Sequence, residues 1–228
     1  MEFLFDTANP EDIRRYGEIY PITGVTSNPS IIKAEGRIDF FAHFRKIRAL
    51  IGSERSLHIQ VVSSDAESML KEADAILAGV DNDVYIKVPV TEDGLKVMRV
   101  LKERGVNITA TAIYTKIQAI LAIQAGADYL APYFNRMENM SIDPRAVIAE
   151  IADLIRMYGY DSKILAASFK NIGQVTDAFS CGAQSATVSP DILHAALQMP
   201  AIAQAVDNFH KDWETTFGEG ARITDFTA

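Results

Sequence analysis

One lysine, Lys87, stands within the apolar segment Val84–Val90, which reads VYIKVPV. If this segment is a β-strand, alternation places Lys87 on the face opposite the valines and the isoleucine, which suit packing against helices. The lysine then points into the interior of a barrel, where burial disfavours its charged form and lowers its pKa. A neutral amine in a pocket is the nucleophile that forms a Schiff base with a carbonyl compound. The alternative is a strand-end lysine that pairs with Asp6 for structure alone.

Polar side chains also interrupt the other predicted strands, and they cluster toward the carboxyl ends of those strands. Barrel active sites sit at that end. Asp6 is a candidate proton carrier, or else the counter-charge of Lys87. Gln60, Thr111 and Tyr133 are candidates to hold a water molecule that carries protons, although a satisfied polar layer at the barrel mouth is the alternative. The whole set comprises Asp6, Thr26, Asn28, Gln60, Lys87, Thr109, Thr111, Tyr133 and Ser168.

A phosphate-binding group is predicted near the ends of two strands. Arg136 follows the sixth predicted strand, and the segment Ser168–Asn171 closes the seventh strand and opens a helix. A guanidinium, a hydroxyl and the free N–H groups of a helix start suit a phosphate dianion. The alternative is a surface arginine and an ordinary helix cap.

Eight short β-rich runs recur along the chain, and an amphipathic helical stretch follows each. The pairs Asn9-Pro10 and Asn28-Pro29 each combine a cap residue with a proline that suits the first turn of a helix. Eight such units of about 28 residues indicate parallel strands that close into a (β/α)8 barrel. A doubly wound open sheet is the alternative, but no strand is followed by a Gly-x-Gly-x-x-Gly turn. The predicted strands are Phe3–Thr7, Ile22–Ser27, Leu57–Val62, Val84–Val88, Asn107–Ile113, Tyr129–Phe134, Lys163–Phe169 and Ser185–Val188.

One helix is left over after the eighth unit, at residues 201–217, with Val206, Phe209 and Trp213 at helical spacing. A surplus amphipathic helix at the end of a barrel packs on the barrel or on a neighbouring subunit. We therefore predict that residues 1–228 form a single barrel domain whose last helix is free to reach a neighbour.

The composition excludes several classes of protein. The 228 residues carry 22 Lys+Arg against 30 Asp+Glu, a formal net charge of −8, which disfavours broad nucleic-acid binding. The single cysteine, Cys181, excludes an internal disulfide, and with only four histidines we expect no metal site. His58 shares a strand face with Gln60 and is expected to be a buried core residue. The acidic start and the lack of a long apolar run predict no secretory signal and no membrane span, hence a cytoplasmic protein.

The sequence resembles the small members of the transaldolase family in five segments that occur in the same order. The likeness covers residues 5–170, and a weaker likeness extends to Trp213. It implies a (β/α)8 barrel and class I aldol chemistry through a Schiff base, with no metal and no cofactor. It also implies a homo-oligomer, a pentamer or a decamer, in which the C-terminal helix reaches a neighbour. The five segments are Phe5–Ala8, Gly24–Ile31, Ile86–Thr91, Ala131–Arg136 and Leu165–Lys170.

The same resemblance implies a role for each polar residue. Lys87 corresponds to the Schiff-base lysine of the family. Arg136 and Ser168 correspond to its phosphate binders, and we add Thr26, Thr109 and Lys170 to the predicted substrate-binding set. The acid–base and substrate-positioning set corresponds to Asp6, Asn28, Gln60, Thr111 and Tyr133.

Two positions separate the branches of the family. Transaldolases usually carry Glu and Phe where this chain has Gln60 and Tyr133, whereas the aldolase branch carries the residues found here. The phenol of Tyr133 can hold the water that protonates the enamine and releases free dihydroxyacetone, which a phenyl ring cannot do. The prediction is an aldolase that reversibly cleaves fructose 6-phosphate to dihydroxyacetone and glyceraldehyde 3-phosphate.

Two other functions stay open. A transaldolase would use the same lysine but transfer the dihydroxyacetone unit between sugar phosphates, with sedoheptulose 7-phosphate as a donor and erythrose 4-phosphate as an acceptor. A barrel that binds sugar phosphates without converting them is the second alternative. The chain departs from the family at Ser27, at Ala110 and in the 137–143 loop, which lacks a Gly-rich stretch, so the donor and acceptor preferences are open.

Overall fold

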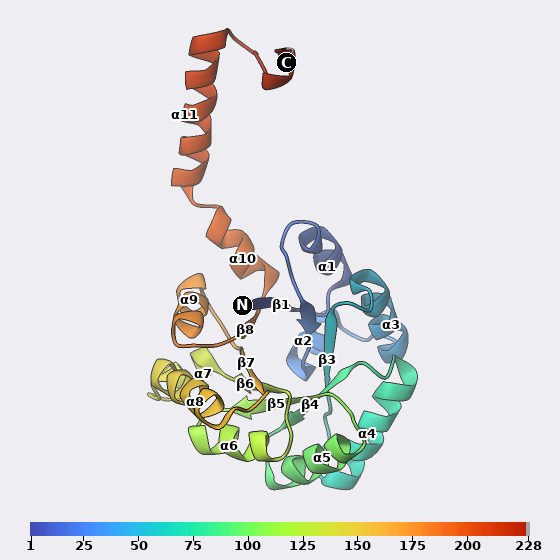
Figure 1. The fold of residues 1–228 in the computed structure, drawn as a ribbon. Helices are drawn as coiled ribbons and strands as arrows, with labels where there is room; N and C mark the ends of the chain where they lie inside the picture. Colours follow the sequence, from blue (N-terminus) through green and yellow to red (C-terminus); the bar gives the residue numbers. More distant parts are fainter. Residues whose placement is uncertain (227–228) are drawn as a thin grey trace. The chain divides into compact units, whose positions relative to one another are not determined.

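The computed structural model describes residues 1–226, which contain a closed barrel of parallel strands (Figure 1). Strands that follow one another along the chain are neighbours in the barrel, and β8 closes the ring by pairing with β1. The predicted (β/α)8 barrel is confirmed. Its strands are β1 (Glu2–Asp6), β2 (Gly24–Thr26), β3 (Ser56–Gln60), β4 (Tyr85–Pro89), β5 (Ile108–Ile113), β6 (Tyr129–Pro132), β7 (Lys163–Ala166) and β8 (Ser185–Val188).

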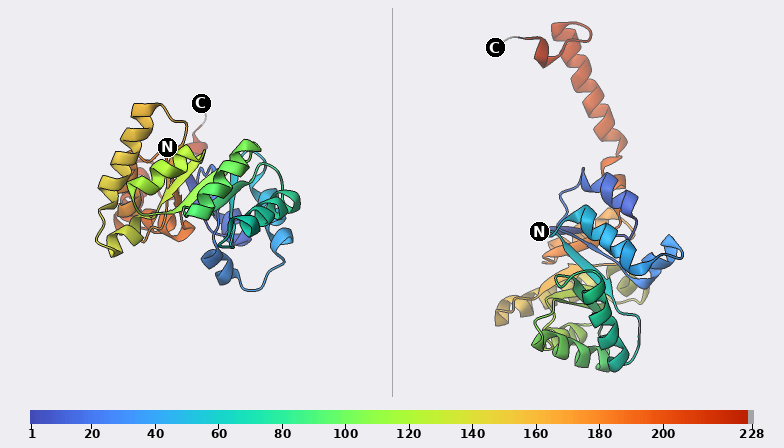
Figure 2. Two further views of the ribbon diagram at one scale, coloured as in Figure 1. Left: turned by 90° about the horizontal axis from the view of Figure 1, so that it is seen from below. Right: turned by 90° about the vertical axis from the view of Figure 1, so that its right-hand side faces the viewer.

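Helices surround the strands of this barrel (Figures 1 and 2). They cover the apolar outer faces of the strands, whose alternate residues point into the interior. The helices that connect the strands are α1 (Pro10–Gly17), α2 (Pro29–Glu35), α3 (Phe40–Ile51), α4 (Ala66–Gly79), α5 (Glu92–Glu103), α6 (Lys116–Gln124), α7 (Phe134–Asn139), α8 (Pro144–Tyr158) and α9 (Ile172–Ser180).

The predicted capping signals begin helices α1 and α2. The side chains of Asn9 and Asn28 each accept hydrogen bonds from two backbone N–H groups of the first helical turn. The proline that follows each asparagine lacks an N–H, so it costs no hydrogen bond at that position. These caps turn the chain sharply after β1 and β2 and fix the strand ends that carry Asp6 and Thr26.

Several strands end earlier than predicted, and two connections contain a second helix. Phe134, predicted to lie in the sixth strand, is the first residue of α7, and the predicted 137–143 loop is helical as far as Asn139. Val62 and Phe169 likewise lie beyond the ends of β3 and β7. Phe134 is completely buried, and a short run of buried apolar residues does not distinguish a strand from the start of a helix.

Polar side chains from several strands satisfy one another inside the barrel. The hydroxyls of Thr26 and Thr187 lie 2.6 Å apart, although β1 separates their strands. At the amino ends of the strands, Glu2 accepts hydrogen bonds from Lys163 Nζ at 2.6 Å and from Tyr129 Oη at 3.1 Å. Such pairing allows a barrel interior to hold polar groups at little cost in stability.

The chain divides into two compact units, Met1–Pro190 and Asp191–Ala228. The second unit begins at the second residue of α10 (Pro190–Leu197) and contains α11 (Pro200–Phe217). The helix predicted at residues 201–217 is therefore present. The Trp213 indole donates a hydrogen bond to Ala221 O at 2.9 Å, which folds the segment after α11 back onto that helix. No residue of α11 is buried. None of the described helices combines the length and the apolar composition that crossing a bilayer requires.

Candidate active site

A cavity of about 320 Å³ lies at the carboxyl ends of the strands. Its lining comes from β1, β4 and β8, from the chain segments just after β2, β6, β7 and β8, and from helices α2 and α7. This is the end of the barrel at which the sequence predicts the chemistry. The predicted site residues that line it are Asp6, Asn28, Lys87, Tyr133, Arg136, Ser168 and Lys170.

Lys87 reaches this cavity from β4 and is only 2% exposed. Its Nζ donates a hydrogen bond to Ser27 O at 3.3 Å, and no ion pair joins it to Asp6 among residues 1–226. Burial lowers the pKa of Lys87, the charge of Asp6 partly opposes this change, and the positive Arg136 adds to it. The predicted inward orientation of the lysine is therefore confirmed, and Lys87 and Asp6 interact through their charges without a direct ion pair.

Asp6 lies at the end of β1 on the same cavity. Its Oδ1 accepts a hydrogen bond from Thr26 Oγ1 at 2.7 Å. Burial raises the pKa of Asp6, whereas the charge of Lys87 and the hydrogen bond from Thr26 partly lower it. A carboxyl group whose pKa is raised is suited to giving and taking protons closer to neutral pH.

Tyr133 and Arg136 are both positioned by the start of α7. Tyr133 precedes the helix, and its Oη lies 2.9 Å from Thr111 Oγ1 of β5. Residues three apart on a helix face the same way, and the Arg136 guanidinium lies 4.7 Å from the Tyr133 ring centre. The Arg136 side chain is further held by a long hydrogen bond to Tyr114 Oη at 3.4 Å. The helix that replaces the predicted strand end thus brings a phenol and a guanidinium to one wall of the cavity.

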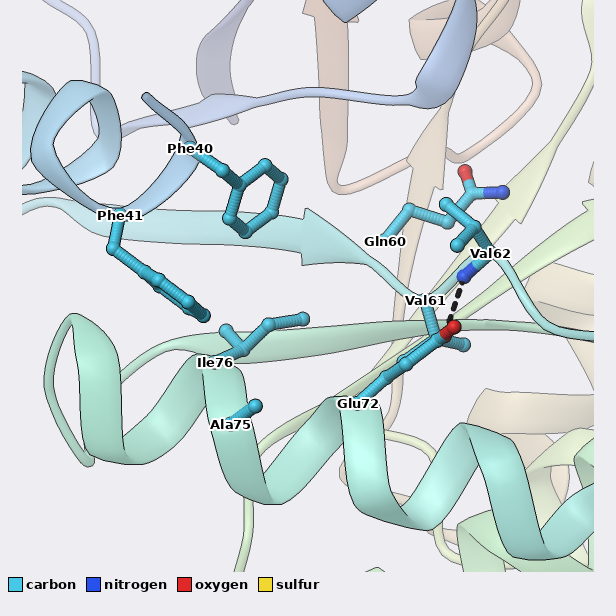
Figure 3. Close-up of a pocket in the computed structure, with 8 residues that line it drawn as sticks. All are labelled: Phe40, Phe41, Gln60, Val61, Val62, Glu72, Ala75 and Ile76. Carbon is cyan, nitrogen blue, oxygen red and sulfur yellow. Dashed lines mark hydrogen bonds between the residues drawn. The ribbon is translucent and has the colours of Figure 1, made fainter. Parts of the chain in front are cut away.

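Gln60 is paired with Lys87 in the register of β3 and β4, so both side chains face the barrel interior. Figure 3 shows its amide pointing away from the phenylalanine rings of α3. Its Oε1 is buried and has no hydrogen-bond partner among the described residues. The chain after β3 is held in place because Glu72 accepts a hydrogen bond from Val62 N at 2.7 Å (Figure 3). Gln60 lines the pocket drawn in Figure 3 and is not among the residues that line the cavity of Lys87.

The turn between β7 and α9 brings predicted phosphate-binding residues to the cavity. Ser168 adopts a φ of 64°, a left-handed conformation that is costly for a residue with a side chain, and its carbonyl accepts a hydrogen bond from Asn135 N at 2.9 Å. This bond ties the Ser168 turn to α7, which carries Arg136. The N–H groups of Lys170 and Gln174 already have side-chain partners, so fewer helix N–H groups are free for an anion than predicted.

Two predicted substrate-binding residues do not line the cavity. Thr26 is buried and instead supports Asp6. Thr109 is also buried, and its hydroxyl lies 2.7 Å from Nδ1 of His58. Thr109 therefore differs from the other predicted substrate-binding residues, because its hydroxyl is engaged with His58 in the barrel interior.

The sequence prediction missed three polar residues that line the cavity, Ser30, Thr187 and Ser189. Thr187 is a polar residue near the carboxyl end of the short strand β8, so the criterion used for the other strands could have found it. Its hydroxyl completes the chain of hydrogen bonds that runs through Thr26 to Asp6. Ser189 lies just after β8 and gives no comparable signal in the sequence.

His58 is completely buried inside the barrel, as predicted. Its Nδ1 lies 2.7 Å from Thr109 Oγ1, its Nε2 lies 2.9 Å from Ser56 Oγ, and its ring stacks on Tyr85 with centroids 4.6 Å apart. Burial lowers the pKa of His58 to about 3, and the positive charges of Lys87 and Arg48 contribute to this. The ring is therefore neutral throughout the physiological pH range.

This buried imidazole predicts a loss of stability in acid. The unfolded chain takes up a proton on His58 near pH 6.5, whereas the folded chain does so only near pH 3. The contribution of the neutral ring to the free energy of unfolding is therefore fully present above pH 6.5 and decreases as the pH drops toward 3. The contribution of this one group is about 2 kcal/mol between pH 7.5 and pH 5. Urea unfolding at both pH values, at one protein concentration, should show a smaller loss for His58→Gln than for the unaltered protein. An equal loss in both would contradict the assignment.

Within residues 1–226, no group of three or more His, Cys, Asp or Glu side chains is placed to hold a metal ion. The chemistry that the cavity offers comes from one buried amine, one carboxyl group, several hydroxyls and a guanidinium.

Comparison with known proteins agrees with this arrangement. The family described as "Transaldolase/Fructose-6-phosphate aldolase" matches residues 3–227. A protein of Streptococcus pneumoniae (strain ATCC 700669 / Spain 23F-1) named "Probable fructose-6-phosphate aldolase" is 52% identical over 213 residues, which cover 93% of this chain and 96% of the relative. Both activities in the family's description are those of enzymes, which confirms the expectation of an enzyme. The chain therefore belongs to the transaldolase/fructose-6-phosphate aldolase family.

Proposed function

We propose that the protein is a Schiff-base aldolase that reversibly cleaves fructose 6-phosphate to dihydroxyacetone and glyceraldehyde 3-phosphate. The observation that carries this proposal is the buried amine of Lys87, which has a lowered pKa and lies in a cavity with a carboxyl group, a phenol and a guanidinium. The relative named as a probable fructose-6-phosphate aldolase supports the choice of substrate.

In the first half of the reaction, neutral Lys87 attacks the ketone carbon C2 of the sugar. The resulting carbinolamine loses water and becomes a positively charged iminium. Asp6 and a water molecule held by Gln60, Thr111 and Tyr133 supply and remove the protons of these steps. The partnerless Oε1 of Gln60 and the pair of hydroxyls 2.9 Å apart are suitable anchors for that water.

In the second half, a base removes the proton of the C4 hydroxyl, and the C3–C4 bond breaks. The electron pair of that bond moves to the iminium and forms an enamine, while glyceraldehyde 3-phosphate leaves. Protonation of the enamine at carbon, followed by hydrolysis of the new iminium, releases dihydroxyacetone and the free lysine. The proposal assigns the proton donor for the enamine to a water molecule held by the phenol of Tyr133, which lines the cavity.

Arg136 and Ser168 are proposed to hold the phosphate, aided by Lys170 at the exposed edge of the cavity. Binding energy at this distant group orients the reacting carbonyl toward Lys87. The positive charge of Arg136 also contributes to the lowered pKa of the lysine.

Replacing Arg136 by Gln should weaken the recognition of phosphorylated substrates selectively. The change removes a charge-assisted contact with phosphate, which corresponds to a loss of about tenfold or more in kcat/KM for fructose 6-phosphate. The addition of dihydroxyacetone to unphosphorylated glyceraldehyde should change much less, and steady-state assays of both reactions measure this. A proportional loss in both reactions would contradict the phosphate role of Arg136.

A transaldolase is the second candidate, because the family includes this activity and the same lysine would serve it. The enamine would then persist until erythrose 4-phosphate arrives as acceptor. Assays of fructose 6-phosphate consumption with and without this acceptor separate the two functions. Release of free dihydroxyacetone without an acceptor supports the aldolase, whereas turnover that requires the acceptor supports the transaldolase. A barrel that only binds sugar phosphates predicts protection in a thermal melt with neither turnover nor covalent trapping.

We also propose that the protein is a homo-oligomer, a pentamer or a decamer, in which α11 packs on a neighbouring subunit. Val206 is 59% exposed and Phe209 is 71% exposed, and they lie on an 18-residue helix that has no buried residue. Exposed apolar side chains at helical spacing favour association with another surface.

Replacing both Val206 and Phe209 by Ser should lower the oligomeric mass measured by light scattering, because it removes apolar area from the proposed contact. The matched variant Gln204→Ser and Asn208→Ser changes two polar residues of the same helix and should keep the mass unchanged. Equal masses for both double variants would contradict the assembly role of α11.

A further inference from the structure

The strands on either side of β4 are joined inside the barrel by two side chains. His58 belongs to β3 and Thr109 to β5, and their Nδ1 and Oγ1 atoms lie 2.7 Å apart. His58 is paired with Tyr85 in the register, and Thr109 is paired with Lys87. The His58–Thr109 bridge therefore crosses the inner face of β4 between Tyr85, which stacks on the imidazole, and Lys87.

The lysine side chain extends from β4 past β3 toward the end of β2. Its Nζ reaches Ser27 O in the turn after β2, and β3 is the strand between β2 and β4. The side chain therefore crosses the inner face of β3, to which His58 and Gln60 both belong. The carbonyl of His58 also accepts hydrogen bonds from Ser27 N at 3.1 Å and from Ser27 Oγ at 3.2 Å, so the same residue holds the peptide that receives the amine.

We propose that His58 is a positioning residue for Lys87: its bridge to Thr109 supports the lysine side chain so that the amine lies at the cavity beside Ser27. This inference rests on the proposed Schiff-base function. A neutral imidazole suits the position because it has one donor and one acceptor, which pair with the buried hydroxyl of Thr109 and the partly buried hydroxyl of Ser56. An aliphatic side chain would leave the Thr109 hydroxyl without its partner, and a cation would repel the lysine.

The test measures iminium formation directly, as the rate of single-turnover borohydride trapping with fructose 6-phosphate. His58→Leu removes the bridge and should slow trapping and kcat by about tenfold or more, because small displacements of a reacting group are costly. The KM for fructose 6-phosphate should change little, since Arg136 lies on α7 and Ser168 lies in the turn between β7 and α9. His58→Asn retains an amide close to the position of Nδ1 and should restore the rate to within about threefold.

The single variant Thr109→Val should slow trapping, and the double variant with His58→Leu should be no slower than the slower single variant.

Ser185→Ala is the matched control. Its hydroxyl is also completely buried and donates to Ile164 O at 2.9 Å, but Ser185 belongs to β8 and does not line the cavity. It should lower the melting temperature without slowing trapping. If His58→Leu folds and traps at the wild-type rate, the positioning role is overturned. If His58→Leu fails to fold, a wild-type trapping rate in Thr109→Val overturns it instead. A lack of any trapping in the unaltered protein would instead contradict the proposed function.

Discussion

Replacing Lys87 by Met is expected to abolish both aldol turnover and covalent trapping. The nucleophile is lost while a side chain of similar length stays in the barrel, so a fall in kcat on the order of 10⁴-fold or more is expected. Incubation with borohydride and either dihydroxyacetone or fructose 6-phosphate, followed by mass spectrometry of peptides, measures the trapping. The unaltered protein should gain the adduct on the peptide that contains Lys87.

Loss of activity in this variant should not reflect unfolding. Lys87 is 2% exposed, and removing a buried amine with a lowered pKa removes a group that is costly to bury. Lys163→Met is the matched control, because Lys163 begins β7 at the opposite end of the barrel and pairs with Glu2. It should keep full trapping and turnover. Adduct formation that survives Lys87→Met would show that another residue is the nucleophile.

Replacing Tyr133 by Phe is expected to shift the activity from cleavage toward transfer. The change removes the hydroxyl that lies 2.9 Å from Thr111 Oγ1 and, with it, one anchor of the proposed proton-carrying water. Release of dihydroxyacetone should slow by about 10²-fold, a common contribution of a positioned proton donor. Transfer of the three-carbon unit to erythrose 4-phosphate should be less affected, because the enamine then has longer to meet the acceptor.

The ratio of the two rates, measured with and without erythrose 4-phosphate, decides this prediction. The phenyl ring of the variant can retain its edge contact with Tyr114 and its place beneath Arg136, so phosphate binding should persist. Thr111→Val is the matched variant, since it removes the same hydrogen bond from the other side and keeps the phenol. We expect it to shift the ratio in the same direction by a smaller amount. An unchanged ratio in Tyr133→Phe would remove the physical basis for placing the chain on the aldolase branch.

The orientation of Lys87 could be predicted from the sequence because it depends on a local rule. Alternation along β4 separates the lysine from the valines and the isoleucine around it, and helices cover the apolar face. The barrel itself could be predicted for the same reason, since each strand is followed by a helix with its own start signal, such as Asn28 before α2. Burial of His58 followed from its sharing a strand face with Gln60 two positions further along.

The strand ends could not be predicted in the same way. The run that contains Phe134 is apolar because that side chain is buried, and burial at the first turn of a helix gives the same local pattern as a strand. The consequence matters for the site, because α7 places Tyr133 and Arg136 on one wall of the cavity. A strand in its place would have pointed successive residues to opposite faces.

The sequence by itself determined the fold and the family, and it placed Lys87 on a barrel strand facing inward. The tertiary structure decided which polar groups meet. Thr187 comes close to Thr26 only because β8 closes on β1, and Thr109 is turned to His58 and away from the cavity. Local alternation specifies the face of a strand on which a residue lies. The depth of that residue in the barrel and its partners depend on strand register and ring closure, which are set by packing between residues far apart in the chain.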